Sequence, residues 1–133
     1  MIEHFRYGIL VSMKILIVED EQNIRRLYRD ELEDEGYEVI EASSGEEGVA
    51  LFEREKPDLV MLDVFLDCID EGIFVLRRMK QLRPTVPVII VSAFDYTDDL
   101  EVWDADGYIT KSSDLSELKM AIKEAAGTTI ATA

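Results

Sequence analysis

Polar side chains capable of chemistry stand directly after four largely apolar segments of this sequence. Glu19 and Asp20 follow the first segment, Asp63 the second, Ser92 the third and Lys111 the fourth. Apolar segments of this length are typical of strands that are buried on both faces of a parallel sheet. The carboxyl ends of such strands lie along one edge of the sheet, and ligands bind in the crevice outside them. The five side chains are therefore predicted to share one pocket.

Three carboxylates in one pocket repel each other, by about 4 kcal/mol per pair at about 4 Å and an effective dielectric constant of about 20. A stable fold tolerates this if a hard divalent cation binds there or if the charges serve a reaction. Mg2+ suits carboxylates, waters and a substrate phosphate, and a carboxylate can attack phosphorus to give an aspartyl phosphate. Lys111 would neutralise the phosphoryl oxygens, and the Ser92 hydroxyl would donate to them. The pattern favours phosphoryl acceptance on Asp63.

Strand-like and helix-like segments alternate along the chain and would position these residues. Strands are expected over 14–18, 37–41, 59–62, 86–91 and 107–110, each followed by apolar residues at helical spacing. The fourth helix, over 98–103, is expected to be short. The alternation predicts an α/β fold with helices on both faces of a five-stranded parallel sheet. In the flavodoxin-like (βα)5 order, 2-1-3-4-5, the first and third strands are neighbours, so their terminal carboxylates converge.

Helix boundaries are marked by capping and breaking residues. Gly36 is expected to end the first helix, and Ser44 with Glu47 matches a capping box that starts the second. Pro57 is expected to break the second helix. The third helix is expected from Ile73 onward, after a polar, irregular stretch.

The composition describes one domain and excludes several functional classes. The chain has 133 residues, of which 47% are hydrophobic, and a formal net charge of −15. The electrostatic field of this negative charge repels phosphate backbones, and no direct nucleic acid partner is therefore expected. The single cysteine, Cys68, excludes a disulfide framework, and the single histidine, His4, leaves no histidine-based metal cluster. No apolar segment approaches the ~18 residues that cross a membrane, and a cytoplasmic location is expected.

The two ends of the chain do not fit the alternating pattern. Residues 1–12 precede the first βα unit and are expected to form an N-terminal extension. A tag remnant, an upstream start and an added arm would each explain it. Residues 13–126 are expected to form the functional domain, and residues 127–133 a short C-terminal tail of small residues.

Four segments carry a resemblance to a known family. They are Ile15-Leu-Ile-Val-Glu-Asp-Glu21, Pro57-Asp-Leu-Val-Met-Leu-Asp63, Val88-Ile-Ile-Val-Ser-Ala93 and Asp106-Gly-Tyr-Ile-Thr-Lys111. With them, the sequence resembles the receiver domain of two-component response regulators over nearly its whole length. The resemblance implies a phosphoprotein of a phosphorelay, which takes its phosphoryl group from a sensor histidine kinase or a phosphotransfer protein. It implies an unknown downstream protein target and leaves room for a homodimer.

The resemblance also implies a role for each residue of the acidic pocket. Asp63 would accept the phosphoryl group, and Asp20 would be a direct Mg2+ ligand. Glu19 would lie close to the metal, often through a water molecule. The backbone carbonyl of Phe65, two residues beyond the acceptor, matches a further protein ligand of the metal. The domain would promote only its own phosphorylation and dephosphorylation and would not be an enzyme in the ordinary sense.

Three other positions are assigned to phosphate binding and switching by the same resemblance. Lys111 would hold the phosphate, and Ser92 would move inward to bond it. Tyr108 matches the aromatic residue whose ring turns inward after phosphorylation. A strand-end aromatic is equally explained by half-buried packing, so both interpretations of Tyr108 stay open.

Departures from the family pattern keep two alternatives in view. Ser112 stands where a proline usually follows the lysine, and the segment from Ser92 to Lys111 is shorter than usual. These features keep a pseudo-receiver possible, in which the fold binds partners without phosphorylation. A haloacid-dehalogenase-type phosphatase also uses an aspartate after a buried strand. That family needs a second aspartate two residues later, where this chain has Phe65.

Overall fold

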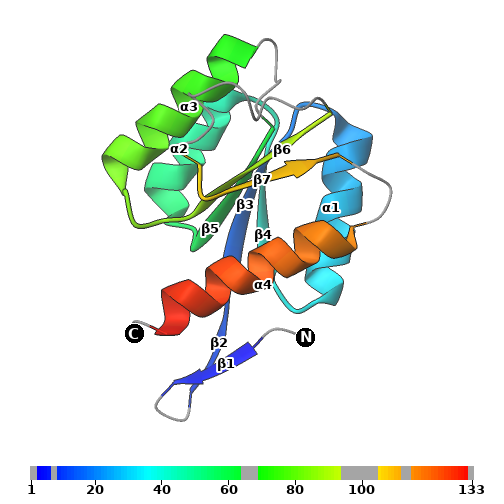
Figure 1. Cartoon of the computed structure of the whole chain (residues 1–133), viewed down its shortest axis with the longest axis vertical. Helices are drawn as coiled ribbons and strands as arrows, with labels where there is room; N and C mark the ends of the chain where they lie inside the picture. The colour runs from blue at the N-terminus through cyan, green and yellow to red at the C-terminus, as the bar shows by residue number, and fades with distance from the viewer. Residues whose placement is uncertain (1–2, 7–8, 64–68, 94–104, 112–114, 132–133) are drawn as a thin grey trace.

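The computed structural model describes residues 3–6, 9–63, 69–93, 105–111 and 115–131. Five parallel strands form the central sheet in the order β4-β3-β5-β6-β7, as Figure 1 shows. The strands are β3 (Lys14–Val18), β4 (Glu38–Ala42), β5 (Leu59–Leu62), β6 (Val88–Ser92) and β7 (Gly107–Thr110). Because β3 and β5 are the first and third strands of the repeating units, the flavodoxin-like order 2-1-3-4-5 is confirmed.

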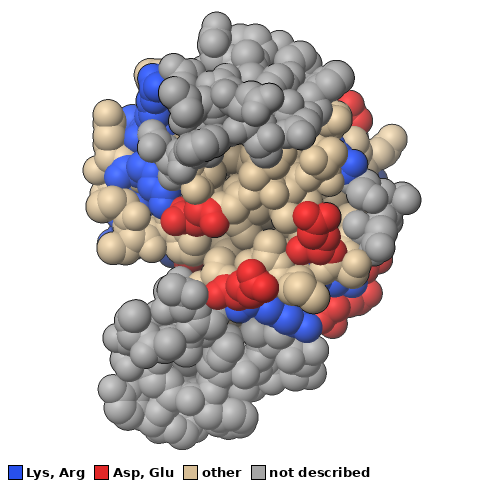
Figure 2. Space-filling view, viewed as in Figure 1, with Lys and Arg blue, Asp and Glu red and all other residues tan. Residues whose placement is uncertain are grey.

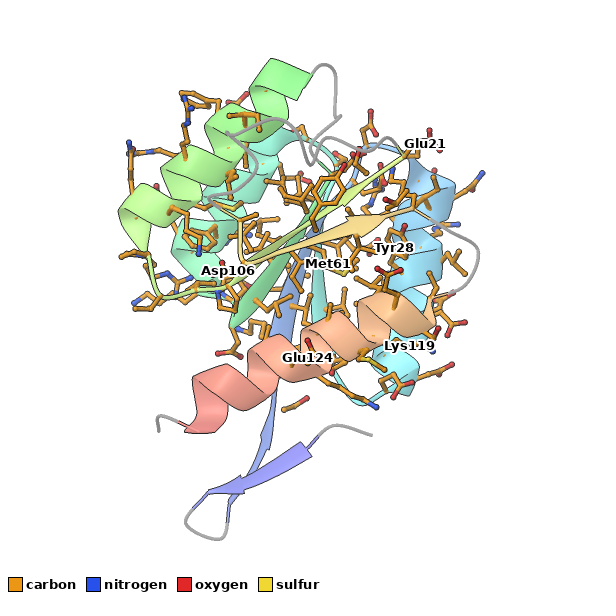
Figure 3. The ribbon with its side chains drawn as sticks, in the orientation of Figure 1. Glu21, Tyr28, Met61, Asp106, Lys119 and Glu124 are labelled. Atoms are coloured by element: carbon orange, nitrogen blue, oxygen red, sulfur yellow. The ribbon has the colours of Figure 1, made fainter. Side chains whose placement is uncertain are left out.

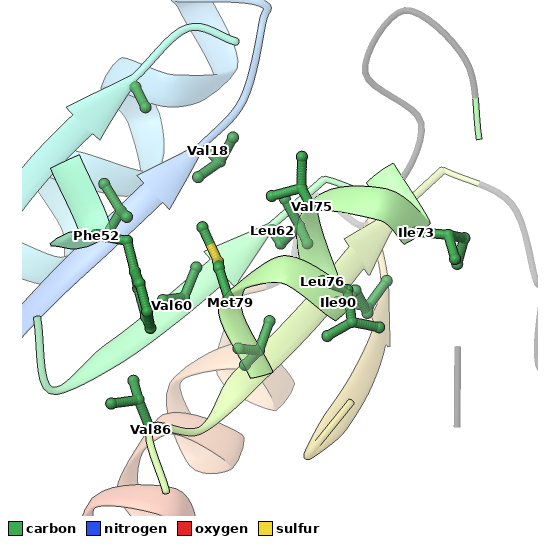
Figure 4. Close-up of a cluster of buried hydrophobic side chains, with 13 residues drawn as sticks. Val18, Phe52, Val60, Leu62, Ile73, Val75, Leu76, Met79, Val86 and Ile90 are labelled. Atoms are coloured by element: carbon green, nitrogen blue, oxygen red, sulfur yellow. The ribbon is translucent and has the colours of Figure 1, made fainter. Parts of the chain in front are cut away.

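The described helices cover both faces of the sheet, as Figure 1 shows. On one face lie α1 (Gln22–Asp34) and α4 (Ser116–Ala131), and on the other α2 (Gly45–Glu55) and α3 (Ile69–Leu82). Alternate residues of each strand point to opposite faces, so β3 sends Leu16 and Val18 into one core and Ile15 and Ile17 into the other. Figure 4 shows the core beneath α2 and α3, where Phe52 and Met79 pack on the sheet.

The expected helix boundaries are largely present. Helix α1 ends in a Schellman motif at Gly36. The φ angle of Gly36 is 95°, a backbone conformation that glycine adopts without steric strain. The Ser44 Oγ accepts a 3.1 Å hydrogen bond from the Glu47 amide, while the Glu47 carboxylate accepts from the Ser43 amide at 2.8 Å. The reciprocal bond of the capping box is therefore made one residue earlier than the standard pattern. Helix α2 ends at Glu55, before Pro57.

The structure differs from the sequence expectation at two helices. Helix α3 starts at Ile69, four residues before the first expected helical position, so part of the irregular stretch is helical. The last helix continues through Gly127 to Ala131 rather than ending at a tail, because one internal glycine costs a helix only about 1 kcal/mol. The short helix expected over 98–103 lies outside the described residues.

The N-terminal extension contains a two-stranded hairpin. Strands β1 (Glu3–Arg6) and β2 (Ile9–Ser12) pair antiparallel and form a sheet of their own, below the main sheet in Figure 1. Only Met13 separates β2 from β3, and the Ser12 hydroxyl donates a 2.7 Å hydrogen bond to the Gly36 carbonyl. This bond ties the hairpin to the turn after α1.

Close packing of α2 on the sheet gives a test of the fold. A Cβ atom on Gly48 would lie 2.9 Å from Cγ2 of the buried Val18. We expect Gly48→Ala to lower the free energy of unfolding by about 1 to 3 kcal/mol, despite the better helix propensity of alanine. Urea denaturation measures this change. Val18→Ala removes the obstructing methyl groups, so the double variant should lose less than the sum of the two single variants. A stabilising Gly48→Ala would contradict the packing.

Candidate functional site

The carboxyl ends of β3 and β5 bring two acidic residues together in the interior. Val18 pairs with Leu62 in the parallel register, so the next residues, Glu19 and Asp63, emerge side by side. The Glu19 amide donates to the Ala42 carbonyl and the Asp63 amide to the Val18 carbonyl, both at 3.0 Å. These bonds extend the strand ladders to the site. Glu19 is 2% exposed and Asp63 4% exposed, unusually low values for carboxylates.

Lys111 supplies the countercharge from the end of β7. Its Nζ lies 2.6 Å from Glu19 Oε1 and 3.1 Å from Asp63 Oδ2. Burial lowers the pKa of Lys111, but the attraction of Glu19 and Asp63 outweighs burial and leaves the pKa raised. The ammonium group therefore remains charged and bridges the two carboxylates.

A third carboxylate completes an all-oxygen cluster. Oxygen atoms of Glu19, Asp20 and Asp63 lie within 4.8 Å of one another, with Asp20 at the exposed rim. Burial, and secondarily the neighbouring Asp63, raises the pKa of Glu19, although Lys111 opposes the shift. Burial and the neighbouring Glu19 raise the pKa of Asp20. Mg2+ prefers hard oxygen ligands, and its charge would offset the repulsion among these carboxylates. The donor atoms of the cluster therefore fit Mg2+.

Ser92 and Tyr108 lie on the strands beside this cluster. Ser92 is fully buried at the end of β6, and its carbonyl accepts a 2.6 Å hydrogen bond from the Lys111 amide. The structure thus places Glu19, Asp63, Ser92 and Lys111 along one sheet edge. Tyr108 is half-buried and packs against the core beneath α2 and α3. The positions of Phe65 and Ser112 lie outside the described residues.

Two residues near the site were not singled out by the sequence. Tyr28 on α1 is 4% exposed, lines the small spaces beside Asp63 and Lys111, and projects toward the sheet in Figure 3. Arg25 donates a 2.9 Å hydrogen bond to the Glu19 carbonyl and lies 3.4 Å from a Glu41 oxygen. Helical spacing predicts that Tyr28 faces inward. No local sequence pattern predicts the contacts of Arg25 with Glu19 and Glu41.

The family model for the response regulator receiver domain matches residues 15–123, and the chain belongs to this family. PhoP, the alkaline phosphatase synthesis transcriptional regulatory protein of Bacillus subtilis, is 40% identical over 117 residues, covering 85% of this chain and 48% of PhoP. Sporulation initiation phosphotransferase F of the same organism is 34% identical over 118 residues, covering 86% of this chain and 94% of the relative. The chain thus spans about half of PhoP and nearly all of the phosphotransferase.

Solved structures agree with this assignment. The response regulator TrrA of Thermotoga maritima, in complex with Mg(2+)-BeF, matches with a TM-score of 0.82 and 37% identity over 86% of this chain and 99% of TrrA. TrrA in complex with the histidine kinase ThkA matches with a TM-score of 0.80 and 36% identity over 86% of this chain and 98% of that chain. The chain is therefore a receiver domain of the two-component response regulator class, a signalling domain. No helix in its described part could span a membrane.

Repulsion among the three carboxylates predicts a stabilising substitution. We expect Asp20→Asn to raise the free energy of unfolding in a buffer containing EDTA, because it removes one of the crowded charges and keeps the shape of the side chain. Urea denaturation measures the change. Asp30→Asn, on the exposed face of α1, is the matched control and should change stability little. A less stable Asp20→Asn would mean that the protein itself compensates this carboxylate.

Proposed function

We propose that this chain is the phosphoacceptor of a two-component phosphorelay and that Asp63 takes a phosphoryl group from the phosphohistidine of a histidine kinase or phosphotransfer protein. The observation that carries the proposal is a buried carboxylate held 3.1 Å from the Lys111 ammonium inside an acidic cluster. The receiver domain would span residues 13–126, act in the cytoplasm and switch the binding of a downstream protein. It would promote its own phosphorylation and dephosphorylation without turning over a separate substrate.

The chemistry at Asp63 follows from its surroundings. A carboxylate oxygen of Asp63 would form the new bond to phosphorus, while the bond from phosphorus to the imidazole nitrogen breaks and its electron pair returns to the histidine. Lys111 Nζ, already between Glu19 and Asp63, would hold a phosphoryl oxygen. Mg2+ held by Asp20, Asp63, Glu19 and the Phe65 carbonyl would neutralise charge on the phosphoryl oxygens.

Ser92 and Tyr108 would convert phosphorylation into a change of surface. Ser92 is buried beside Lys111, and its hydroxyl would move inward with the end of β6 to donate to the phosphoryl group. Strands β6 and β7 pair through Ile90 and Tyr108 and through Ser92 and Thr110. A movement at Ser92 would therefore displace β7, which carries Tyr108, the proposed switch aromatic. New charge-assisted hydrogen bonds would favour the switched state.

Phosphorylation is tested by intact mass after incubation with acetyl phosphate and Mg2+. We expect an adduct of about 80 Da, one phosphoryl group, that requires both Mg2+ and Asp63. Asp63→Asn is the control for the acceptor, and Lys111→Ala should slow formation of the adduct. Lack of an adduct in a protein that still binds Mg2+ would favour either a receiver that rapidly hydrolyses its own phosphoryl group or the pseudo-receiver. Turnover of phosphomonoesters would instead favour a phosphatase.

Metal binding is tested separately by stability. Mg2+ at about one hundred times its dissociation constant should raise the free energy of unfolding by about 2.7 kcal/mol, because it binds the folded state. Differential scanning calorimetry with and without Mg2+ measures the gain. Asp20→Asn should lose most of the gain, whereas Asp30→Asn should keep it. An equal gain in both variants would place the cation elsewhere.

A further inference from the structure

An open groove lies between α2 and α3, the two neighbouring helices on one face of the sheet in Figure 1. Its volume is about 550 Å3, and Val49 and Ala50 of α2 and Phe74 and Val75 of α3 provide its apolar lining. Phe74 is 67% exposed, more than the other exposed large hydrophobic side chains of the described residues, Leu27 and Met120. An exposed aromatic side chain in the wall of a groove has the form of an interface anchor.

Packing of the two helices explains why the groove is apolar and preformed. A Cβ atom on Gly45 would lie 2.6 Å from Val75 Cγ2 and 2.9 Å from Glu71 Oε1, so the helices approach closely at this glycine. Val75 is buried and points into the core in Figure 4, whereas Phe74, the preceding residue, faces outward. The groove is therefore built on a rigid floor rather than on a loop.

Charge around the groove is mainly negative. Glu46, Glu53 and Glu71 line it, against one base, Arg78. Within the described part of the chain, no ion pair neutralises these three carboxylates. Glu46 and Glu71 lie toward the N-terminal ends of α2 and α3, and Arg78 lies toward the other end. Lysine and arginine side chains gather farther along the side formed by α3 in Figure 2.

We propose that the α2–α3 groove docks a short amphipathic helix of a partner protein. One apolar side chain of that helix packs on Phe74, and lysine or arginine side chains face Glu46 and Glu71. The lining of α2 from Gly45 to Glu53 is about 12 Å long at 1.5 Å per residue, so roughly two helical turns fit. This interaction goes beyond phosphoryl acceptance and does not require it.

Charge complementarity favours a basic partner over a second copy of this chain. Another copy would bring a formal charge of −15 and the same groove carboxylates. Repulsion would then oppose the apolar contact, most strongly at low salt. A basic amphipathic helix gains from the same field, because long-range attraction speeds its encounter with the groove.

The test uses a fluorescently labelled peptide of about 14 residues, made of leucine and lysine, with leucines at helical spacing. A comparison peptide has the same composition with leucines at alternate positions. Fluorescence anisotropy at physiological salt gives the affinity of each peptide for the full chain. We expect tighter binding of the helical-pattern peptide, and a loss of at least about tenfold in Phe74→Ser, because the variant lacks the aromatic side chain that the bound peptide would cover.

Matched variants separate the groove from general electrostatic attraction. Met120→Ser removes another exposed apolar side chain, on α4, and should change the affinity less than about twofold. Glu46→Lys should weaken binding more than Asp30→Lys, which makes the same charge change on α1. Circular dichroism checks that each variant is folded.

Three results would overturn the proposal. The first is equal affinity for the two peptides, and the second is undiminished binding by Phe74→Ser. The third is a dimer of the peptide-free chain, seen by sedimentation velocity, that Phe74→Ser dissociates, because the groove would then belong to a second copy. Phosphorylation of Asp63 in the Phe74→Ser variant should be unchanged, so failure here is distinguishable from failure of the acceptor site.

Discussion

One ammonium group balances the two carboxylates that are buried at the end of the sheet. Lys111 Nζ contacts both Glu19 and Asp63, whose side chains are nearly inaccessible to solvent. An uncompensated charge in such a place costs several kcal/mol. The bridge offsets the cost of burying both carboxylates and holds Glu19 and Asp63 next to each other at the strand ends. Asp20 adds its charge at the rim, where water screens it.

The position of Lys111 depends on the short edge strand β7, which is fixed at both ends. At its carboxyl end, the Lys111 amide bonds the Ser92 carbonyl. At its amino end, Asp106 and Val88 exchange two hydrogen bonds of 2.8 Å, one through the Asp106 side chain. Lys80 of α3 pairs with the same Asp106 side chain and bonds the Val86 carbonyl. The contacts at both ends of β7 therefore fix the position of Lys111, whose ammonium group supplies the countercharge of the site.

Ion pairs hold the opposite side of the site through α1. Arg25 joins the Glu19 carbonyl to Glu41 of β4, and Arg29 bonds the other oxygen of Glu41 at 2.8 Å. Lys119 of α4, labelled in Figure 3, bridges Glu31 of α1 and Glu35, the residue that caps the end of α1. Each exposed pair contributes little stability alone. Of these contacts, the bond from Arg25 to the Glu19 carbonyl ties α1 directly to the β3–α1 connection, where the acidic residues emerge.

The strand ends could be predicted because burial on both faces leaves a strong sequence signal. Glu19, Asp63, Ser92 and Lys111 each interrupt an apolar segment, and parallel topology alone gathers such interruptions at one edge. The contacts of Arg25 and Tyr28 could not be predicted, because they depend on how α1 is rotated against the sheet. The extent of α3 and α4 was missed because polar first turns and small C-terminal residues have no periodic apolar pattern.

Both faces of the sheet bury an apolar core, but the contacts of the helices differ between the two faces. On the α1 and α4 face, ion pairs join the helices at the surface above an apolar core. On the other face, Gly45 and Gly48 let α2 approach Val75 and Val18 within van der Waals contact. Close packing resists small displacements more strongly than screened ion pairs do. If phosphorylation switches the edge formed by β7, as proposed above, the closely packed α2–α3 face can present the same groove before and after the switch.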